Sequence, residues 1–332
     1  MRTLLLSFQA RAAALFRWLA GLFAWIPRPL RRALMWGALA VPAAVLVYTL
    51  VLIPFTPSIS DIRKAKSELP AQLMSVDGKL LAEYRCANRE WVELSQISPN
   101  VVNALIATED HRFYDHFGLD WRRTASSVVH TLRGDPQGGS TITQQLARNL
   151  FPEEIGRSRV FPQALTRKLK EAITALKIEA SYTKDEILET YLNTVPFLYN
   201  AYGIEMAART YFDKSADKLN VLESATLIGM LKGTAYYNPV LNPERAQARR
   251  NTVLSQMVKR GKLEEKQLEA LQKRPLRVNF ERQTEVMGPA PHFAMQLRKQ
   301  LIEWADSHGY NLYADGLVIR TTIDSRLQAA AN

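Results

Sequence analysis

The feature that most restricts this chain is an uncharged apolar run from Ala33 to Ile53. As a helix, a run of this length spans the hydrocarbon core of a bilayer, and Pro42 within it is tolerated in a membrane helix. Arginines but no acidic residues precede the run, and positive residues stay on the cytoplasmic side of a membrane. We therefore predict a single-pass anchor over residues 33–53, with the basic segment 1–32 in the cytoplasm and the remaining chain outside it.

A cleaved signal peptide is the alternative to this anchor. Its apolar core would be shorter, and Pro54 and Pro57 make a poor cleavage site. An earlier apolar run, residues 12–26, is interrupted by Arg17 and is more typical of a helix that lies in the membrane interface.

Composition narrows what the rest of the chain can do. With 332 residues, of which 47% are hydrophobic, the chain can bury a large core, and general disorder is excluded. The formal charge of +11 is typical of a protein that meets nucleic acid, an anionic membrane surface or a phosphorylated substrate. A basic domain outside the membrane excludes nucleic acid. Cys86 is the only cysteine, which excludes an intrachain disulfide and a cysteine-based metal cluster.

Hydrophobic periodicity predicts a mainly α-helical chain with a small β element. The expected elements, in chain order, are a connector over 54–70, a hairpin over 72–84 with its turn at Asp77–Gly78, a short strand at 91–94, helices from Ser98 to about residue 273, a helix over 292–305, a strand over 317–323 and a helix from Ser325. We expect the late strand to pair with the hairpin, because neither has another sheet to join.

Two adjacent carboxylates, Glu109 and Asp110, end the first long helix. Ser98 is a good N-cap for this helix, and Pro99 suits its first position. A helix C-terminus carries partial negative charge, so acidic residues there do not stabilise the helix. Aromatic residues follow the two carboxylates in the sequence, and carboxylates in such surroundings suit general acid or base catalysis. A helix end frayed into a polar loop is the alternative.

Residues 138–149 form a second candidate site. Its two glycines allow a ligand to approach the backbone closely. Ser140 is predicted to cap a helix whose first amides could bind an anion. The helix then offers donors to phosphate or sugar oxygens from Gln144, Gln145, Arg148 and Asn149. It is no nucleotide P-loop, because the Gly-Lys-Ser/Thr ending is absent. An ordinary capped helix is the alternative.

The helix around Arg167–Glu171 is a third candidate. Helical spacing predicts an apolar side made of Leu165, Leu169, Ala172, Ile173 and Leu176. It predicts an opposite, polar side made of Arg167, Lys170, Glu171 and Thr174. A solvated face with an Arg167–Glu171 pair explains this pattern. The functional interpretation is a cationic cluster for a pyrophosphate with a carboxylate beside it.

A fourth block begins with a capping box formed by Thr183 and Glu186. The apolar residues of the helix that follows, over 187–193, indicate structural support. Glu189 is the one residue there that is suited to orient a catalytic group.

These four blocks, in this order and spacing, resemble the motifs of the peptidoglycan glycosyltransferase family. That family comprises the monofunctional biosynthetic transglycosylases and the N-terminal catalytic domain of class A penicillin-binding proteins. The matching blocks are Glu109–Gly118, Gly138–Gln145, Arg167–Glu171 and Ile187–Asn193, with Asn200–Glu205 and Tyr211–Phe212 resembling a fifth motif. The similarity covers about residues 70–262. The tail Thr321–Asp324 resembles the linker into a transpeptidase domain, so a truncated bifunctional protein is an alternative.

The resemblance implies a lysozyme-like helical domain over 71–273 on the outer face of the cytoplasmic membrane, followed by a linker over 274–332. It implies polymerisation of lipid II into β-1,4-linked glycan strands, with release of undecaprenyl pyrophosphate. The implied partners are lipid II, the growing strand and the membrane, with other cell-wall synthesis proteins left open. No cofactor is required, and a loosely bound divalent cation such as Mg2+ at the pyrophosphate is left open. His111 and His116 do not share a helix face and have no third ligand, so no metal site is predicted.

The resemblance also implies residue roles. Glu109 is the general base on the acceptor's 4-hydroxyl in an inverting displacement, and Glu171 is the second catalytic carboxylate, which positions the donor. The residues expected to bind substrate and pyrophosphate are Asp110, Ser140, Thr141, Gln144, Gln145, Arg148, Asn149, Arg167, Lys168 and Lys170. The residues expected to support the site are Phe113, His116, Gly118, Glu189 and Asn193.

Three departures from the family pattern stand out. Arg148 replaces the usual lysine, which keeps the charge but changes the geometry of the donors. Asp213 stands where glycine is typical, at a turn that tolerates it. The loop over 152–162 is longer than usual, so the family's loop arginine is left open between Arg157 and Arg159.

Two other classes of function remain as alternatives. A lysozyme-like muramidase would also use a glutamate, but its sugar leaving group needs neither a cationic cluster nor an anchor. A non-enzymatic membrane-tethered scaffold is the other, and the intact Glu109 and Glu171 argue against it.

Overall fold

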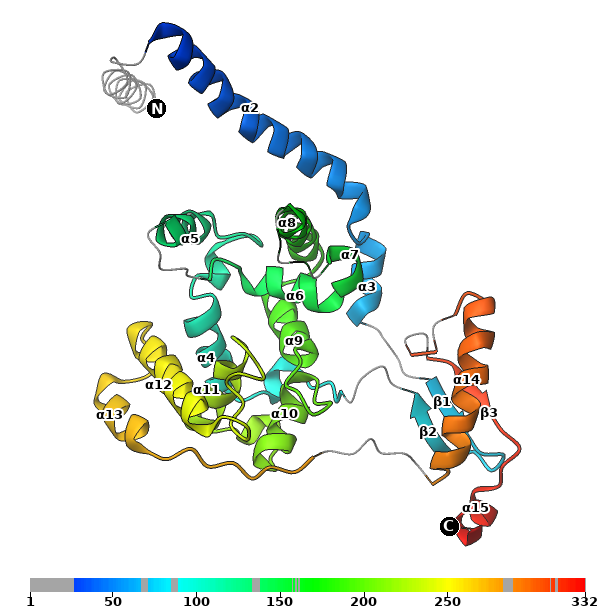
Figure 1. Ribbon diagram of the computed structural model, residues 1–332. Coiled ribbons are helices and arrows are strands. Elements are labelled where there is room, and N and C mark those ends of the chain that lie inside the picture. The colour runs from blue at the N-terminus through cyan, green and yellow to red at the C-terminus, as the bar shows by residue number, and fades with distance from the viewer. Residues whose placement is uncertain are drawn as a thin grey trace. The chain divides into compact units, whose positions relative to one another are not determined.

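The computed structural model describes residues 27–66, 71–84, 89–132, 138–156, 158, 160, 162–282, 289–310, 312–313 and 316–331. The chain divides into two compact units, Met1–Phe55 and Thr56–Asn332. The helices and strands are α2 (Arg28–Leu52), α3 (Ile59–Lys66), β1 (Ala71–Met74), β2 (Leu80–Tyr84), α4 (Pro99–Glu109), α5 (Trp121–Leu132), α6 (Ile142–Leu150), α7 (Pro152–Ile155), α8 (Gln163–Ser181), α9 (Lys184–Thr194), α10 (Gly203–Phe212), α11 (Val221–Met230), α12 (Pro243–Lys259), α13 (Glu265–Lys273), α14 (Pro291–Ser307), β3 (Val318–Arg320) and α15 (Ser325–Ala331) (Figure 1). A mainly α-helical chain with a small β element is confirmed.

The apolar run near the N-terminus is helical. All of it but Ile53, which begins a short 3-10 helix, lies in α2, which begins after Pro27 and contains Pro42. Among the residues that the structure describes, no helix has both the length and the apolarity needed to cross a membrane. The basic residues before Pro27, and the interfacial helix expected over 12–26, lie outside the described residues.

The core of the second unit lies among the central helices. α4 packs against α11 and α12, and α6 packs against α8 and α9. These contacts bury side chains such as Leu105, Leu146, Leu192 and Leu254 completely. Burial on this scale is the main source of stability for such a domain. α4, α6 and α8, the three helices that carry the candidate site residues, are thus fixed by one core.

The connector before β1 is docked on α8. Ile62 of α3 is fully buried, and its carbonyl accepts a hydrogen bond from the Tyr182 hydroxyl at 2.7 Å. Lys177 of α8 donates to Thr56 Oγ1 at 2.8 Å and to the Pro57 carbonyl at 2.9 Å. Burial lowers the pKa of Lys177. These bonds replace part of the solvation that the buried ammonium loses.

The small sheet has the strand order β2-β1-β3. β1 and β2 form the predicted antiparallel hairpin, in which Leu73 faces Ala82, and β3 pairs parallel with β1. The expected pairing of the late strand with the hairpin is therefore confirmed. Leu73 and Leu81 are buried with residues of α14, in a hydrophobic cluster separate from the main core. The hairpin, which we grouped with residues 71–273, thus packs with the C-terminal part of the chain.

The short strand predicted at 91–94 was wrong. Leu94 begins a short 3-10 helix, and the segment contacts side chains of α9 rather than a strand. The Trp91 indole and the Leu94 amide each donate to Glu189 at 3.1 Å. Asn193 accepts from the Val92 amide at 3.0 Å and donates to the Val92 carbonyl at 2.8 Å. These side chains satisfy the backbone groups that a neighbouring strand would otherwise satisfy.

Asp77, in the hairpin turn, holds the start of α15. The Ser325 amide donates to Asp77 Oδ1 at 2.9 Å, and the Ser325 hydroxyl donates to Asp77 Oδ2 at 2.6 Å. These bonds hold the pKa of Asp77 well below its ordinary value of 3.8. Because its pKa is lowered, ionised Asp77 stabilises this attachment at every pH above the ordinary pKa. The stabilisation is lost as the pH falls from the ordinary pKa through the lowered one.

We therefore expect Asp77→Asn to weaken the attachment of α15 at pH 7. Hydrogen exchange should show faster exchange of the Ser325 amide in the variant. In the native chain the protection should hold at neutral pH and decline only in acid below about pH 4. Equal exchange rates in the two proteins at pH 7 would contradict this role for Asp77.

Candidate active site

Glu109 stands at the C-terminal end of α4. As predicted, Ser98 caps this helix, accepting from the Asn100 amide at 3.3 Å, and Pro99 occupies its first turn. The side chains of Leu105 and Ile106 are buried in the core. The Glu109 side chain, one turn further along, keeps 15% of its surface exposed. The helix therefore presents one carboxylate at the edge of the core.

A chain of hydrogen bonds orients this carboxylate. Gln145 of α6 donates its Nε2 to Glu109 Oε2 at 2.9 Å, and its Oε1 accepts from the Tyr191 hydroxyl at 2.9 Å. Tyr191 is almost fully buried, and burial raises its pKa, with the charge of Glu109 raising it further. On the other side, Arg249 Nη2 lies 3.9 Å from Glu109 Oε1. Because a carboxylate accepts hydrogen bonds, Glu109 faces the Nε2 end of the Gln145 amide, and the Oε1 end is left to accept from Tyr191.

Tyr191 and Arg249 were missed by the sequence analysis. Tyr191 lies in a helix whose apolar pattern assigned it to the core, and it is indeed buried. Arg249 is one of three arginines in α12, with Arg245 and Arg250, and nothing in its neighbourhood sets it apart. Only the packing of α4 against α12 brings Arg249 to Glu109.

Asp110 has a different setting from its neighbour Glu109. It is fully buried, and its Oδ2 lies 3.0 Å from His116 Nε2 and accepts from the Ile142 amide at 3.1 Å. Arg123 Nη1 lies 3.8 Å from Asp110 Oδ1, and Arg123 also donates to the Glu109 carbonyl. Asp110 thus joins the end of α4 to the first amide of α6.

Thr141, not Ser140, caps α6, so the predicted cap was wrong by one residue. Thr141 Oγ1 accepts from the Gln144 amide at 3.2 Å, and the Gln144 side chain accepts from the Thr141 amide at 3.0 Å. This reciprocal capping box fits the spacing of Thr141 and Gln144. Thr141 also donates to the Gly118 carbonyl at 2.6 Å. Both side chains are buried and hold the backbone of the site.

Glu171 is the second carboxylate of the site and is fully buried. Lys168 Nζ lies 2.5 Å from Glu171 Oε2, and Arg167 donates to Glu171 Oε1. Arg148 Nη1 approaches from α6 to 3.9 Å. Lys168 also donates to Ser140 Oγ at 2.8 Å. Three cations therefore surround one buried anion, which leaves the cluster with an excess of positive charge.

Lys170 does not join this cluster. Its ammonium donates to the Glu154 carbonyl of α7 at 2.7 Å. Of the two lysines expected to bind substrate, Lys168 therefore lies beside Glu171 and Lys170 does not. Lys170 and Glu171 are adjacent on a helix, so their side chains point about 100° apart.

The predicted faces of α8 were also wrong. Glu171 and Thr174, assigned to the polar side, are fully buried, whereas Leu165 and Leu176 are 38% and 40% exposed. α8 packs against α6, and the charge of the buried Glu171 is compensated by Arg148 of α6 together with Arg167 and Lys168 of α8 itself. Helical periodicity alone predicts that a carboxylate is exposed, because it does not show which cations neutralise its charge.

The two carboxylates are connected through α6. Gln145 contacts Glu109, and Arg148, three residues further along, contacts Glu171. Residues three apart lie on the same face of a helix. The charge of Arg148 also lowers the pKa of Tyr191, so it acts within the surroundings of Glu109. α6 thus connects Glu109, through Gln145, with Glu171, through Arg148.

The remaining predicted residues lie around this pair. Phe113 is buried, with Lys184 Nζ 4.4 Å from its ring centre. Gly118 has φ +71°, and a Cβ there would lie 3.1 Å from the Ala175 carbonyl, so a side chain would be strained. Asn149 is half-buried at the end of α6.

Some expectations fall outside what the structure describes. Arg157 and Arg159 lie outside the described residues, so the loop arginine stays unassigned. Among the described residues, no group of three or more His, Cys, Asp or Glu side chains could hold a metal ion.

A mainly helical fold with one accessible carboxylate, and a second carboxylate ringed by cations, suits an enzyme that transfers a group from an anionic leaving group. The comparisons give the family. The family described as "Transglycosylase" matches residues 77–258, more than half of the chain. The chain therefore belongs to the transglycosylase family, which confirms the resemblance to peptidoglycan glycosyltransferases.

Similar proteins include two curated penicillin-binding proteins. Penicillin-binding protein 1A of Escherichia coli (strain K12) is 39% identical over 284 residues, which are 84% of this chain and 32% of that protein. Penicillin-binding protein 2D of Bacillus subtilis (strain 168) is 35% identical over 308 residues, 92% of this chain and 43% of that protein. A crystal structure of penicillin-binding protein 1A from Haemophilus influenzae is 24% identical, with a TM-score of 0.39 over 80% of this chain and 28% of that chain. This chain thus spans less than half the length of these relatives.

Proposed function

We propose that this chain polymerises lipid II into β-1,4-linked glycan strands and releases undecaprenyl pyrophosphate. The observation that carries the proposal is the pair of carboxylates joined by Gln145 and Arg148 on α6. One carboxylate is accessible and the other sits among three cations. This is the separation of roles that a displacement with an anionic leaving group requires.

In the proposed reaction Glu109 takes the proton of the acceptor's 4-hydroxyl. The oxygen then attacks the anomeric carbon of the donor, the bond from that carbon to the pyrophosphate breaks, and the configuration is inverted. One base and no covalent intermediate are sufficient for an inverting displacement. Gln145 and Tyr191 hold Glu109 in position for this transfer.

Arg148, Arg167 and Lys168 would neutralise the departing pyrophosphate. In the structure all three lie on Glu171, which keeps them close together despite their mutual repulsion. We propose this as the role of Glu171. Charge develops on the leaving oxygen in the transition state, where such preformed cations are most effective.

A divalent cation does not fit this cluster. Glu171 is the carboxylate nearest the proposed pyrophosphate site, and three cationic side chains already surround it. A magnesium ion there would face their positive charge at close range. We therefore assign no step to a metal ion.

For location, we propose that residues 33–53 anchor the chain in the cytoplasmic membrane, with the catalytic unit outside. The support is the uncharged run and the arginines that precede it. A reporter enzyme fused after residue 60 should be active only outside the cytoplasm. Activity inside the cytoplasm would refute this orientation.

The direct test of the function is incubation of the purified chain with lipid II. We expect long glycan polymers together with undecaprenyl pyrophosphate. A muramidase would instead release muropeptides from preformed cell wall. Muropeptide release without polymer would replace the proposal with the hydrolase.

The neighbouring lysines of α8 provide a matched pair of variants. We expect Lys168→Ala to lower kcat/KM for lipid II by about tenfold to a hundredfold, because it removes a charge-assisted contact from the cluster. Lys170→Ala removes the same charge two residues away and should stay within about twofold of the native rate, because Lys170 binds the Glu154 carbonyl. The rate of glycan polymerisation from lipid II is measured for both variants. The reverse order of effects would contradict the role of Lys168.

A further inference from the structure

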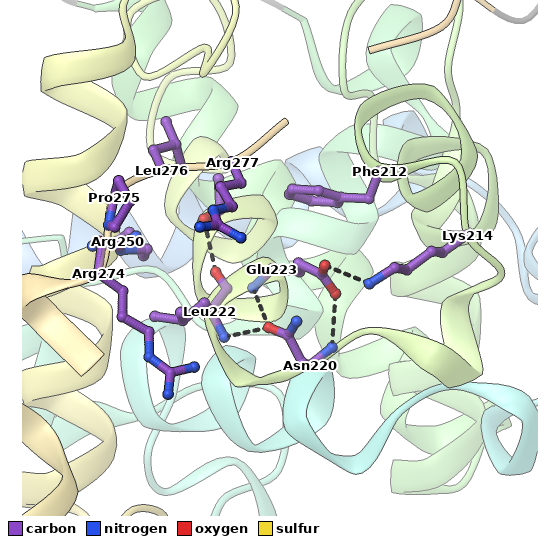
Figure 2. A pocket seen from close by; sticks show the side chains of 11 residues that line it. Phe212, Lys214, Asn220, Leu222, Glu223, Arg250, Arg274, Pro275, Leu276 and Arg277 are labelled. Atoms are coloured by element: carbon purple, nitrogen blue, oxygen red, sulfur yellow. Dashed lines mark hydrogen bonds and ion pairs between the residues drawn. The ribbon is translucent and has the colours of Figure 1, made fainter. Parts of the chain in front are cut away.

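A cavity of about 520 Å³ opens between the end of α10, the start of α11 and the chain that follows α13 (Figure 2). Its volume falls within the roughly 300–1,000 Å³ of pockets that hold small organic ligands. None of the residues that line it belongs to the candidate active site. The proposed reaction therefore gives this cavity no role.

Hydrogen bonds fix one wall of the cavity. Arg250 of α12 is only 1% exposed, and its Nη2 donates to the Arg274 carbonyl at 2.7 Å and to the Gln272 carbonyl at 3.3 Å. These bonds determine where the chain leaves α13. They bring Pro275 and Arg277 to the cavity, as Figure 2 shows.

A turn fixes the opposite wall. α10 ends at Asp213 in the left-handed conformation, with φ 51° and ψ 47°. Asp tolerates this region better than most residues, which agrees with the turn predicted for Asp213. The turn directs Lys214 back to Glu223 of α11, where the two form an ion pair at 2.7 Å. Both walls are thus held by contacts within the protein, so the cavity is preformed.

The lining carries excess positive charge. Its cationic side chains are Lys214, Arg250, Arg274 and Arg277, and its only carboxylate is Glu223, which Lys214 already pairs. Within the described part of the chain, no carboxylate forms an ion pair with Arg274 or Arg277. Arg274 and Arg277 each present a guanidinium group, which suits a carboxylate or a phosphate because one such group can contact it through paired donors.

The uncharged part of the lining is mostly apolar, with Asn220 and Thr226 as its polar residues. Phe212 is 5% exposed, and Leu222 and Leu276 are half-buried. Figure 2 shows Arg277 between Arg250 and Phe212, so charge and apolar surface adjoin. We propose that this cavity binds a small organic anion, a carboxylate or phosphate group carried on a ring. The ring would cover the apolar side chains, and the anionic group would contact the guanidinium of Arg277, which Figure 2 shows beside Phe212, with Arg274 adding to the positive charge of the lining.

The test uses phenyl phosphate, titrated into the full chain in a non-ionic detergent and followed by calorimetry. We expect saturable binding, and about tenfold or greater weakening in the Arg274→Ala/Arg277→Ala double variant. Phenol, which has the ring without the charge, should bind much more weakly. Equal binding of phenol and phenyl phosphate, or no saturable binding at all, would overturn the proposal.

Two controls separate this cavity from other cationic surfaces. Lys259→Ala/Lys262→Ala removes two exposed charges elsewhere and should leave binding unchanged, so an equal loss there would mean that only net charge matters. Arg148→Ala tests the candidate active site, and binding lost only in that variant would place the phosphate there instead. The Glu109→Gln variant should bind phenyl phosphate as the native chain does, even if it no longer polymerises lipid II. Failure of this inference is therefore distinct from failure of the proposed function.

Discussion

Glu109→Gln is expected to reduce polymerisation of lipid II by about 10²–10⁴-fold, the usual contribution of a general base. The amide keeps the shape of the side chain but cannot take the proton of the acceptor hydroxyl. Because the carboxylate is partly exposed and accepts one hydrogen bond from Gln145, the fold should be retained. Glycan polymer measured from purified lipid II gives the rate, and thermal unfolding checks the fold.

Glu153→Gln is a suitable control for this variant. Glu153 lies exposed on α7 and takes no part in the proposed chemistry. It should polymerise lipid II like the native chain. Equal polymer from Glu109→Gln and from the native chain would remove Glu109 from the mechanism.

Glu171→Gln is expected to cost both stability and activity. Removing the one anion leaves Arg148, Arg167 and Lys168 to repel one another. Breaking a fully buried pair costs about 3–5 kcal/mol, but the side chains of Arg148 and Lys168 are 43% and 41% exposed and regain water. We therefore expect about 2 kcal/mol of destabilisation. Dispersal of the cations should lower polymerisation further than the loss of folded protein explains.

Glu179→Gln, two turns further along α8, is the matched control for Glu171→Gln. Glu179 is also buried and paired, accepting from Lys184 at 2.8 Å and from Thr143 at 2.7 Å. Its loss should lower the unfolding temperature by a similar amount while the folded protein still polymerises lipid II. If the two variants lost activity in proportion to stability alone, Glu171 would have only a structural role.

The helix starts and the hairpin could be predicted because their signals lie within a few residues. Ser98 and Pro99 define the start of α4, and Thr183 with Glu186 caps α9. The turn Asp77–Gly78 sets the hairpin. In each case the stabilising hydrogen bonds form between neighbours in the chain, so the local residue types are sufficient.

Other features required the packing of distant segments. Glu189 was predicted to orient a catalytic group, but the contacts described for it are with the Trp91 indole and the Leu94 amide. Tyr191 lies on a third helix and is linked to Glu109 by hydrogen bonds through Gln145. Spacing along one helix contains no information about such partners.

The sequence alone determined the family, the mainly helical composition and the two carboxylates, Glu109 and Glu171, because these depend on residue identity and local periodicity. The tertiary structure decided that Lys168, not Lys170, lies beside Glu171, and that Arg249 faces Glu109. The physical reason is the distance along the chain between the residues that interact. A cap or a turn is stabilised within one turn of chain, whereas the partner of a buried charge is set by which helices the core holds together.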